Sequence, residues 1–199
     1  MSRGDAFYNA PRITNIQNTS LGRIKVSNSG ILMGIGSVTL CNAGSISAGT
    51  LNLNALSWTN TGTISQTGGT LNFGGSFTRA DLGTFTRQSG TAGTVNLTGT
   101  LTNTSATLLL DTSTTGYGTW TLSGGSIIGG TVQTADGRQL LLGSSTLNGV
   151  TIAASSDVVT NSGASVVVVN GLTVNGKITL GIAGGANQVL NFNGTAGIW

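Results

Sequence analysis

One five-residue motif recurs three times in this chain and constrains its fold more than any other feature. It reads Gly-Thr-Leu-Asn-Leu at Gly49–Leu53, Gly-Thr-Leu-Asn-Phe at Gly69–Phe73 and Gly-Thr-Val-Asn-Leu at Gly93–Leu97. Each copy alternates apolar and polar residues after a glycine turn, which is the pattern of a half-buried β-strand. Strands that recur about every 20 residues, with no helical pattern between them, indicate a β-solenoid in which each repeat is one coil.

The alternation also predicts which side chains form the core, because successive residues of a strand point to opposite faces. The apolar members should point inward, namely Leu51, Leu53, Leu71, Phe73, Val95 and Leu97. The asparagines between them, Asn52, Asn72 and Asn96, should form a structural ladder, because amides stacked at strand spacing hydrogen-bond from coil to coil. The fold class is therefore all-β, a parallel β-helix of about eight or nine coils at roughly 20 to 24 residues each.

Composition excludes several classes of site. Charged residues are 7% of the 199 residues, against roughly 25% in a typical globular protein. The eight basic residues are scattered, so we expect no nucleic-acid partner. Histidine and glutamate are absent and Cys41 is the single cysteine, which excludes metal sites of the His/Cys type and Ser-His-Asp triads. We expect no metal, no cofactor, no enzymatic activity and, without a run of 18 apolar residues, no membrane span.

The repeats suggest two regions. Residues 1–20 are the least repetitive and contain the single proline, Pro11, so they are predicted to be an N-terminal cap or lead-in segment. Residues 21–199 are predicted to be parallel β-helix repeats, expected to be a fragment of a longer array.

A candidate binding face follows from the intervals between the strands. The segments 78–82, 87–92 and 111–116 should protrude from the coil corners, where repeat proteins commonly carry function. They bring forward Arg79, Asp81, Arg87, Asp111 and the adjacent Tyr117. Carboxylates and basic residues on one face are how some β-helix enzymes cut polysaccharides, whereas solvated loop charges would only keep the rod soluble.

The aromatic residues leave a similar choice. Five lie in or beside the expected corners, where exposed rings stack on sugars: Trp58, Phe77, Phe85, Tyr117 and Trp120. Phe73, Phe85 and Trp120 occupy strand positions, and there the core is the better prediction. Thr-x-Thr motifs such as Thr84-Phe85-Thr86 and Thr100-Leu101-Thr102 suggest flat hydroxyl faces, but the threonines do not recur at one constant sequence spacing.

The later repeats carry a family resemblance. The segments Gly118–Ile127, Gly171–Gly181 and Val189–Thr195 resemble the β-strand repeats of large bacterial surface proteins of the filamentous-haemagglutinin and autotransporter-passenger kind. The resemblance covers about residues 40–199 and concerns repeat pattern. It implies a right-handed parallel β-helix, located outside the cell on a bacterial surface.

Together these observations predict a non-enzymatic structural or adhesive segment that acts as a stiff stacked rod. Its expected partners are further copies, joined through the solenoid ends into filaments, and surface glycans. The alternative is a carbohydrate-binding or polysaccharide-cleaving β-helix that uses the loop carboxylates and aromatic rings.

Overall fold

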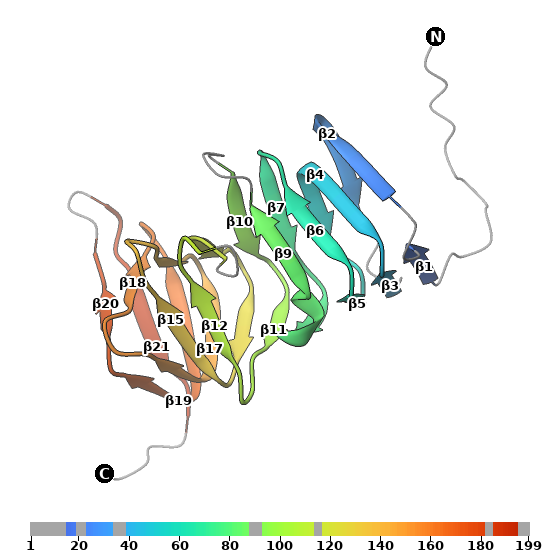
Figure 1. Cartoon of the computed structure of the whole chain (residues 1–199). Helices are drawn as coiled ribbons and strands as arrows, with labels where there is room; N and C mark the ends of the chain where they lie inside the picture. Colours follow the sequence, from blue (N-terminus) through green and yellow to red (C-terminus); the bar gives the residue numbers. More distant parts are fainter. Residues whose placement is uncertain are drawn as a thin grey trace, which may run out of the picture.

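The computed structural model describes residues 15–18, 23–33, 39–87, 93–113, 117–181 and 185–194. Its parallel strands stack along one axis as a β-solenoid (Figure 1). One short 3-10 helix, η1 (Ala80–Leu82), is the helical segment among these residues. In chain order the strands are β1 (Asn15–Asn18), β2 (Arg23–Met33), β3 (Thr39–Asn42), β4 (Ser45–Leu53), β5 (Ser57–Asn60), β6 (Thr63–Gln66), β7 (Thr70–Phe73), β8 (Ser76–Thr78), β9 (Thr84–Arg87), β10 (Thr94–Leu97), β11 (Thr100–Thr102), β12 (Thr107–Leu110), β13 (Trp120–Leu122), β14 (Ser126–Ile128), β15 (Thr131–Thr134), β16 (Leu140–Leu142), β17 (Ser145–Ile152), β18 (Asp157–Thr160), β19 (Ser165–Val174), β20 (Lys177–Thr179) and β21 (Val189–Phe192).

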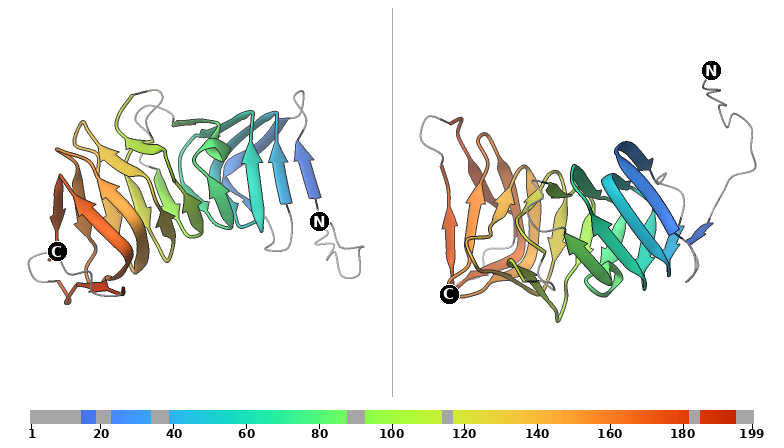
Figure 2. Two further views of the ribbon diagram at one scale, coloured as in Figure 1. Left: turned by 90° about the horizontal axis from the view of Figure 1, so that it is seen from below. Right: turned by 45° about the horizontal axis from the view of Figure 1, so that its top comes forward.

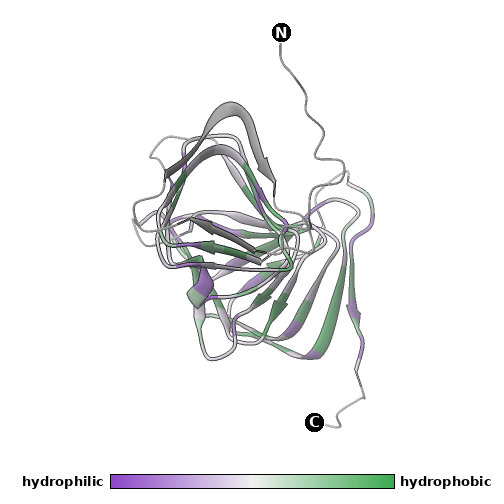
Figure 3. Ribbon diagram, turned by 90° about the vertical axis from the view of Figure 1, so that its right-hand side faces the viewer, coloured by the Kyte–Doolittle hydropathy of each residue, from purple (hydrophilic) through white to green (hydrophobic). Residues whose placement is uncertain are grey.

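Each coil has three sides, which we number in the order that the chain visits them. Face 1 contains β1, β3, β5, β8, β11, β14, the first halves of β17 and β19, and β21. Face 2 contains the first halves of β2 and β4, then β6, β9, β12, β15 and the second halves of β17 and β19. Face 3 contains the second halves of β2 and β4, then β7, β10, β13, β16, β18 and β20. Figure 3 looks along the stack and shows these three-sided coils.

The core fills the interior of the coils, as the alternation predicts. The six residues expected to point inward are confirmed, since Leu51, Leu53, Leu71, Phe73, Val95 and Leu97 are at most 1% exposed. The predicted burial of Phe85 and Trp120 is confirmed too. The ring of Phe73 lies 5.5 Å from each of the rings of Trp58, Phe85 and Trp120, measured between centroids. These aromatic side chains join successive coils into one continuous core.

Among the described residues, face 1 contains nine stacked strands and faces 2 and 3 contain eight each. Strand β1 lies inside the segment predicted as a cap and pairs in parallel with β3, from Asn15 opposite Thr39 to Asn18 opposite Asn42. The remainder of that segment, residues 1–14 and 19–20, lies outside the described residues.

Face 2 contains a discontinuity, which we call the face 2 break. Strand β9 pairs with β6, and β12 pairs with β15, but no pairing joins β9 to β12 among the described residues. Faces 1 and 3 continue past this level through the β8–β11 and β10–β13 pairs. Figure 2 shows the stack of coils from two further sides. The five residues of the predicted binding face belong to the coils that flank the break.

Candidate binding site at the face 2 break

A short return segment, Tyr117–Gly118, lies along the free edge of β12. The backbone N–H of Tyr117 donates to the carbonyl of Leu109 at 3.2 Å, and that of Gly118 donates to the carbonyl of Asp111 at 3.1 Å. Gly118 has φ +69°, and a Cβ atom there would lie 1.9 Å from Nη1 of Arg87. The positive φ favours glycine, and any larger residue here would have to displace the guanidinium group of Arg87.

The ring of Tyr117 closes the core at the break. It is 3% exposed and stacks on Phe85 with 5.8 Å between the ring centroids. The guanidinium carbon of Arg79 lies 4.7 Å from the centroid of the Tyr117 ring, which is a cation–π arrangement. Burial raises the pKa of the Tyr117 phenol, and the charge and hydrogen bond of Arg79 oppose that rise. The Nε atom of Arg79 is itself buried and has no hydrogen-bond partner within the described structure.

Arg87, the last residue of β9, connects three separate segments through its guanidinium group. Its Nε donates to Oε1 of Gln66 at 2.9 Å, its Nη1 to the carbonyl of Tyr117 at 3.4 Å, and its Nη2 to the carbonyl of Gly93. Burial, and secondarily the charge of Arg138, lower its pKa. Arg87 thus links the strand on one side of the break to the return segment on the other.

The two predicted carboxylates, those of Asp81 and Asp111, each accept hydrogen bonds within their own turn. Oδ2 of Asp81 accepts hydrogen bonds from both the N–H and the hydroxyl of Thr78, each at 2.7 Å. Oδ1 of Asp111 accepts from the N–H and the hydroxyl of Ser113 at 3.0 and 2.8 Å. The structure therefore brings Arg79, Arg87 and Tyr117 together, while Asp81 and Asp111 shape loops beside them.

The predicted asparagine residues lie in one row on the outer side of face 3. Asn52, Asn72 and Asn96 are register partners on β4, β7 and β10. Asn72 donates through Nδ2 to Oδ1 of Asn52, and Asn96 donates to Asn72 at 2.8 Å. Hydrogen bonds between these amides fix the register of neighbouring coils. Because the amides are neutral, they also avoid the repulsion that identical charges at these positions would cause.

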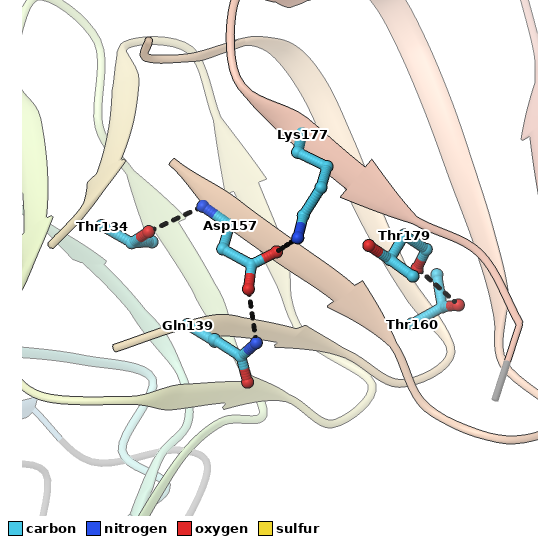
Figure 4. Close-up of polar contacts among 6 residues, drawn as sticks. All are labelled: Thr134, Gln139, Asp157, Thr160, Lys177 and Thr179. Carbon is cyan, nitrogen blue, oxygen red and sulfur yellow. Dashed lines mark hydrogen bonds and ion pairs between the residues drawn. The ribbon is translucent and has the colours of Figure 1, made fainter. Parts of the chain in front are cut away.

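A second polar row, which the sequence analysis missed, lies on face 3 near the C-terminal end (Figure 4). Nε2 of Gln139 donates to Oδ2 of Asp157 at 2.6 Å, and Nζ of Lys177 lies 3.1 Å from Oδ1 of the same carboxylate. The hydrogen bond from Gln139 is the main cause of a lowered pKa at Asp157; Lys177 adds to it and partial burial opposes it. This row depends on Asp157 lying opposite Lys177 in the pairing of β18 with β20. That neighbourhood can be recognised only after the strands have been aligned, so the sequence alone did not reveal it.

Buried asparagines form a further row that the sequence analysis missed. Asn42 and Asn60, each 2% exposed, end two successive strands of face 1. A usable signal was present, because both strands end in asparagine two positions after a large apolar residue, as Thr-Leu-Cys-Asn in Thr39–Asn42 and Ser-Trp-Thr-Asn in Ser57–Asn60. The described residues contain no group of three or more metal-ligating side chains, and within them no helix is long and apolar enough to cross a membrane.

The aromatic rings considered for sugar stacking are in the core. Trp58, Phe77, Phe85, Tyr117 and Trp120 are at most 3% exposed. None of these rings presents a free face to a ligand.

Comparisons with protein-family models, curated proteins and solved structures found no match to this chain.

Proposed function

We propose that the chain is a non-enzymatic structural or adhesive segment of a bacterial cell-surface or secreted protein, in which it acts as a stiff rod. The observation that carries this proposal is the ladder of face 1, which continues from β1 through β3, β5, β8, β11, β14, β17 and β19 to β21. Every step in it is parallel and pairs neighbouring coils. Backbone hydrogen bonds therefore run along the whole described axis, as in other stacked strand arrays.

Stiffness follows from the three-sided cross-section. Bending the rod toward one face stretches the hydrogen bonds between coils on the opposite side, and the apolar core resists the opening that would result. Rows of amides such as Asn52, Asn72 and Asn96 add side-chain bonds in the same direction. The low charge of the chain removes repulsion between identical positions in neighbouring coils.

The adhesive part of the proposal concerns the outer side of face 1. One register row there consists of hydroxyl residues on successive coils, all at least partly exposed: Thr39, Ser57, Ser76, Thr100, Ser126 and Thr146. At the strand spacing of about 4.8 Å, such a row presents repeated neutral donors and acceptors. Neutral surface glycans, which carry hydroxyl groups of the same kind, are the partner class that suits it.

The alternative of a polysaccharide site at the break gains no support from the geometry. Its rings are buried, and each of its carboxylates is hydrogen-bonded within its own turn. The structural proposal accordingly takes precedence.

Native-state hydrogen exchange tests the rod. We expect the amides of face 1 to be protected to a similar degree from β3 to β19, since their opening requires separation of whole coils. Exchange of these amides within seconds would contradict a stiff rod. A second assay incubates the chain with neutral and acidic polysaccharides and measures new reducing ends. We expect none, and product that disappears in Asp81→Ala and Asp111→Ala variants would establish the enzymatic alternative.

A further inference from the structure

The edge of β12 at the face 2 break is already occupied. The N–H groups of Tyr117 and Gly118 donate to its Leu109 and Asp111 carbonyls. Because a neighbouring strand on this side would need the same carbonyls, β9 cannot pair with β12 while the return segment is in place. At this level the ladders of faces 1 and 3 join successive coils, through the β8–β11 and β10–β13 pairs.

Buried asparagines connect other corners between faces 1 and 2. At three corners the Nδ2 of an asparagine donates to the carbonyl of the first residue of the face 2 strand in the next coil. The pairs are Asn42 with Thr63 at 3.3 Å, Asn60 with Thr84 at 3.5 Å and Asn103 with Thr131 at 3.0 Å. These asparagines are at most 2% exposed, so each bond is shielded from water and ties one coil to the face 2 strand of the next.

Arg79 occupies this corner in the coil before the break. Its backbone N–H donates to the carbonyl of Thr102 at 3.1 Å, which places Arg79 opposite Asn103 in the parallel ladder of β8 and β11. Its guanidinium group lies against the ring of Tyr117. Nε of Arg79 and Oδ1 of Asn103 are both buried, and neither has a hydrogen-bond partner within the described structure. The side chains at this corner are therefore not joined as the buried asparagines are elsewhere.

Among the described residues, three polar or aromatic contacts cross the break on face 2, and all of them end on Tyr117. Its ring stacks on Phe85 and lies against the guanidinium group of Arg79, at 5.8 and 4.7 Å from the ring centroid. Its carbonyl accepts the hydrogen bond from Nη1 of Arg87. Tyr117 itself is bound to β12 through its N–H. One residue thus connects the coil of β8 and β9 to the coil of β12 on this face.

We propose that the face 2 break is a one-sided hinge in the rod and that Tyr117 is the pin that keeps it closed. The proposal rests on the rod function above and adds a direction of bending. Bending that opens face 2 at the break stretches no backbone hydrogen bond between β9 and β12, so faces 1 and 3 can serve as the hinge line. The opposite bend compresses the packed core, and at the neighbouring levels the ladder of face 2 resists opening.

Pulsed electron paramagnetic resonance on pairs of spin labels tests this with the full chain, after Cys41→Ser has removed the native thiol. Labels at Thr63→Cys and Thr151→Cys span the break on face 2. Labels at Thr59→Cys and Thr146→Cys join the same two coils on face 1, and all four positions are at least partly exposed. We expect the face 2 pair to give the wider distance distribution, with a tail toward longer distances, because only this face can open at the break.

Tyr117→Leu removes the ring but keeps an apolar side chain in the core. It should widen the distribution of the face 2 pair further and leave that of the face 1 pair unchanged. Arg138→Met, at an exposed arginine, is the control and should change neither distribution. Thermal unfolding shows whether each variant remains folded. If Tyr117→Leu does not fold, Arg79→Met replaces it, because this variant removes the cation–π contact and leaves the ring in place.

Each outcome separates the hinge from the rod. A face 2 distribution no wider than that of face 1 in the wild-type protein would overturn the hinge and leave the rod intact. A Tyr117→Leu variant that leaves the face 2 pair unchanged, or widens both pairs equally, would overturn the role of Tyr117 as the pin. Wide distributions for both pairs in the wild-type protein would refute the stiff rod itself.

Discussion

Nδ2 of Asn42 donates a hydrogen bond to Oδ1 of Asn60 at 2.6 Å, inside the solenoid and between two successive coils. Asn60 in turn donates to the carbonyl of Leu82 at 2.8 Å in the coil after that. These buried amides connect three coils at the corner between faces 1 and 2. Their effect on stability can be separated from that of the exposed ladder.

We expect Asn60→Leu to lower the free energy of unfolding by about 2 kcal/mol, because it leaves the carbonyl of Leu82 buried without its donor. Urea denaturation measures the loss. Asn52→Leu, in the half-buried outer row, should cost less than about 1 kcal/mol, since water can reach its partner Asn72. Equal losses in the two variants would mean that the buried row has no special role.

Arg87 provides a second prediction, at the face 2 break. Arg87→Met keeps much of the side-chain volume but removes the donors to Gln66, Gly93 and Tyr117, and should cost about 2 kcal/mol. Arg138→Met is the matched control, because Arg138 is exposed, and its replacement should change stability by less than about 0.5 kcal/mol. A stable Arg87→Met variant would show that the return segment holds its position without the arginine.

The pKa of Asp157 leads to a prediction for acid. Because this pKa is lower in the folded protein than the ordinary value of 3.8, the carboxylate stabilises the fold above that value. The contribution should be lost as the pH falls through the folded-state pKa. Melting temperatures of wild type and Asp157→Asn, measured between about pH 6 and pH 2, should therefore differ at the upper end and converge at the lower end. A constant difference over this range would exclude the proposed linkage.

Tyr117 leads to the opposite prediction, for base. Burial raises its pKa above the ordinary value of 10.0, so the unfolded chain loses the phenol proton first and stability should fall as the pH rises above that value. Ultraviolet titration of a Tyr8→Phe variant, in which Tyr117 is the remaining tyrosine, should show ionisation above the ordinary range. Titration at the ordinary value would mean that the ring is accessible to water.

The sequence predicted the coils well because the strand period is local information. Alternation in Leu51–Leu53, Leu71–Phe73 and Val95–Leu97 was enough to identify the buried side chains. The length of each corner could not be predicted in the same way, since the residues that a corner uses cannot be read from a strand pattern.

Features that depend on register could not be predicted in the same way. The hydroxyl row that includes Thr39, Ser57 and Thr100 appears irregular in the sequence, because the corners between its members differ in length. In the structure the strands nevertheless align in register. The contacts of Arg87 with Gln66 and Tyr117 join residues that no short motif connects.

The face 2 break also determines where the molecule should begin to unfold. In a linear stack each coil is coupled only to its neighbours, so cooperativity is limited by the weakest coupling. Between the coils that contain β9 and β12, only the ladders of faces 1 and 3 are continuous among the described residues, whereas the neighbouring coils on either side are joined by three ladders. At this level a hydrogen bond from Arg87 to the carbonyl of Tyr117 takes the place of the third ladder. The break is therefore the natural boundary between two foldons, one toward β1 and one toward β21, and a pulling force should separate the rod there first.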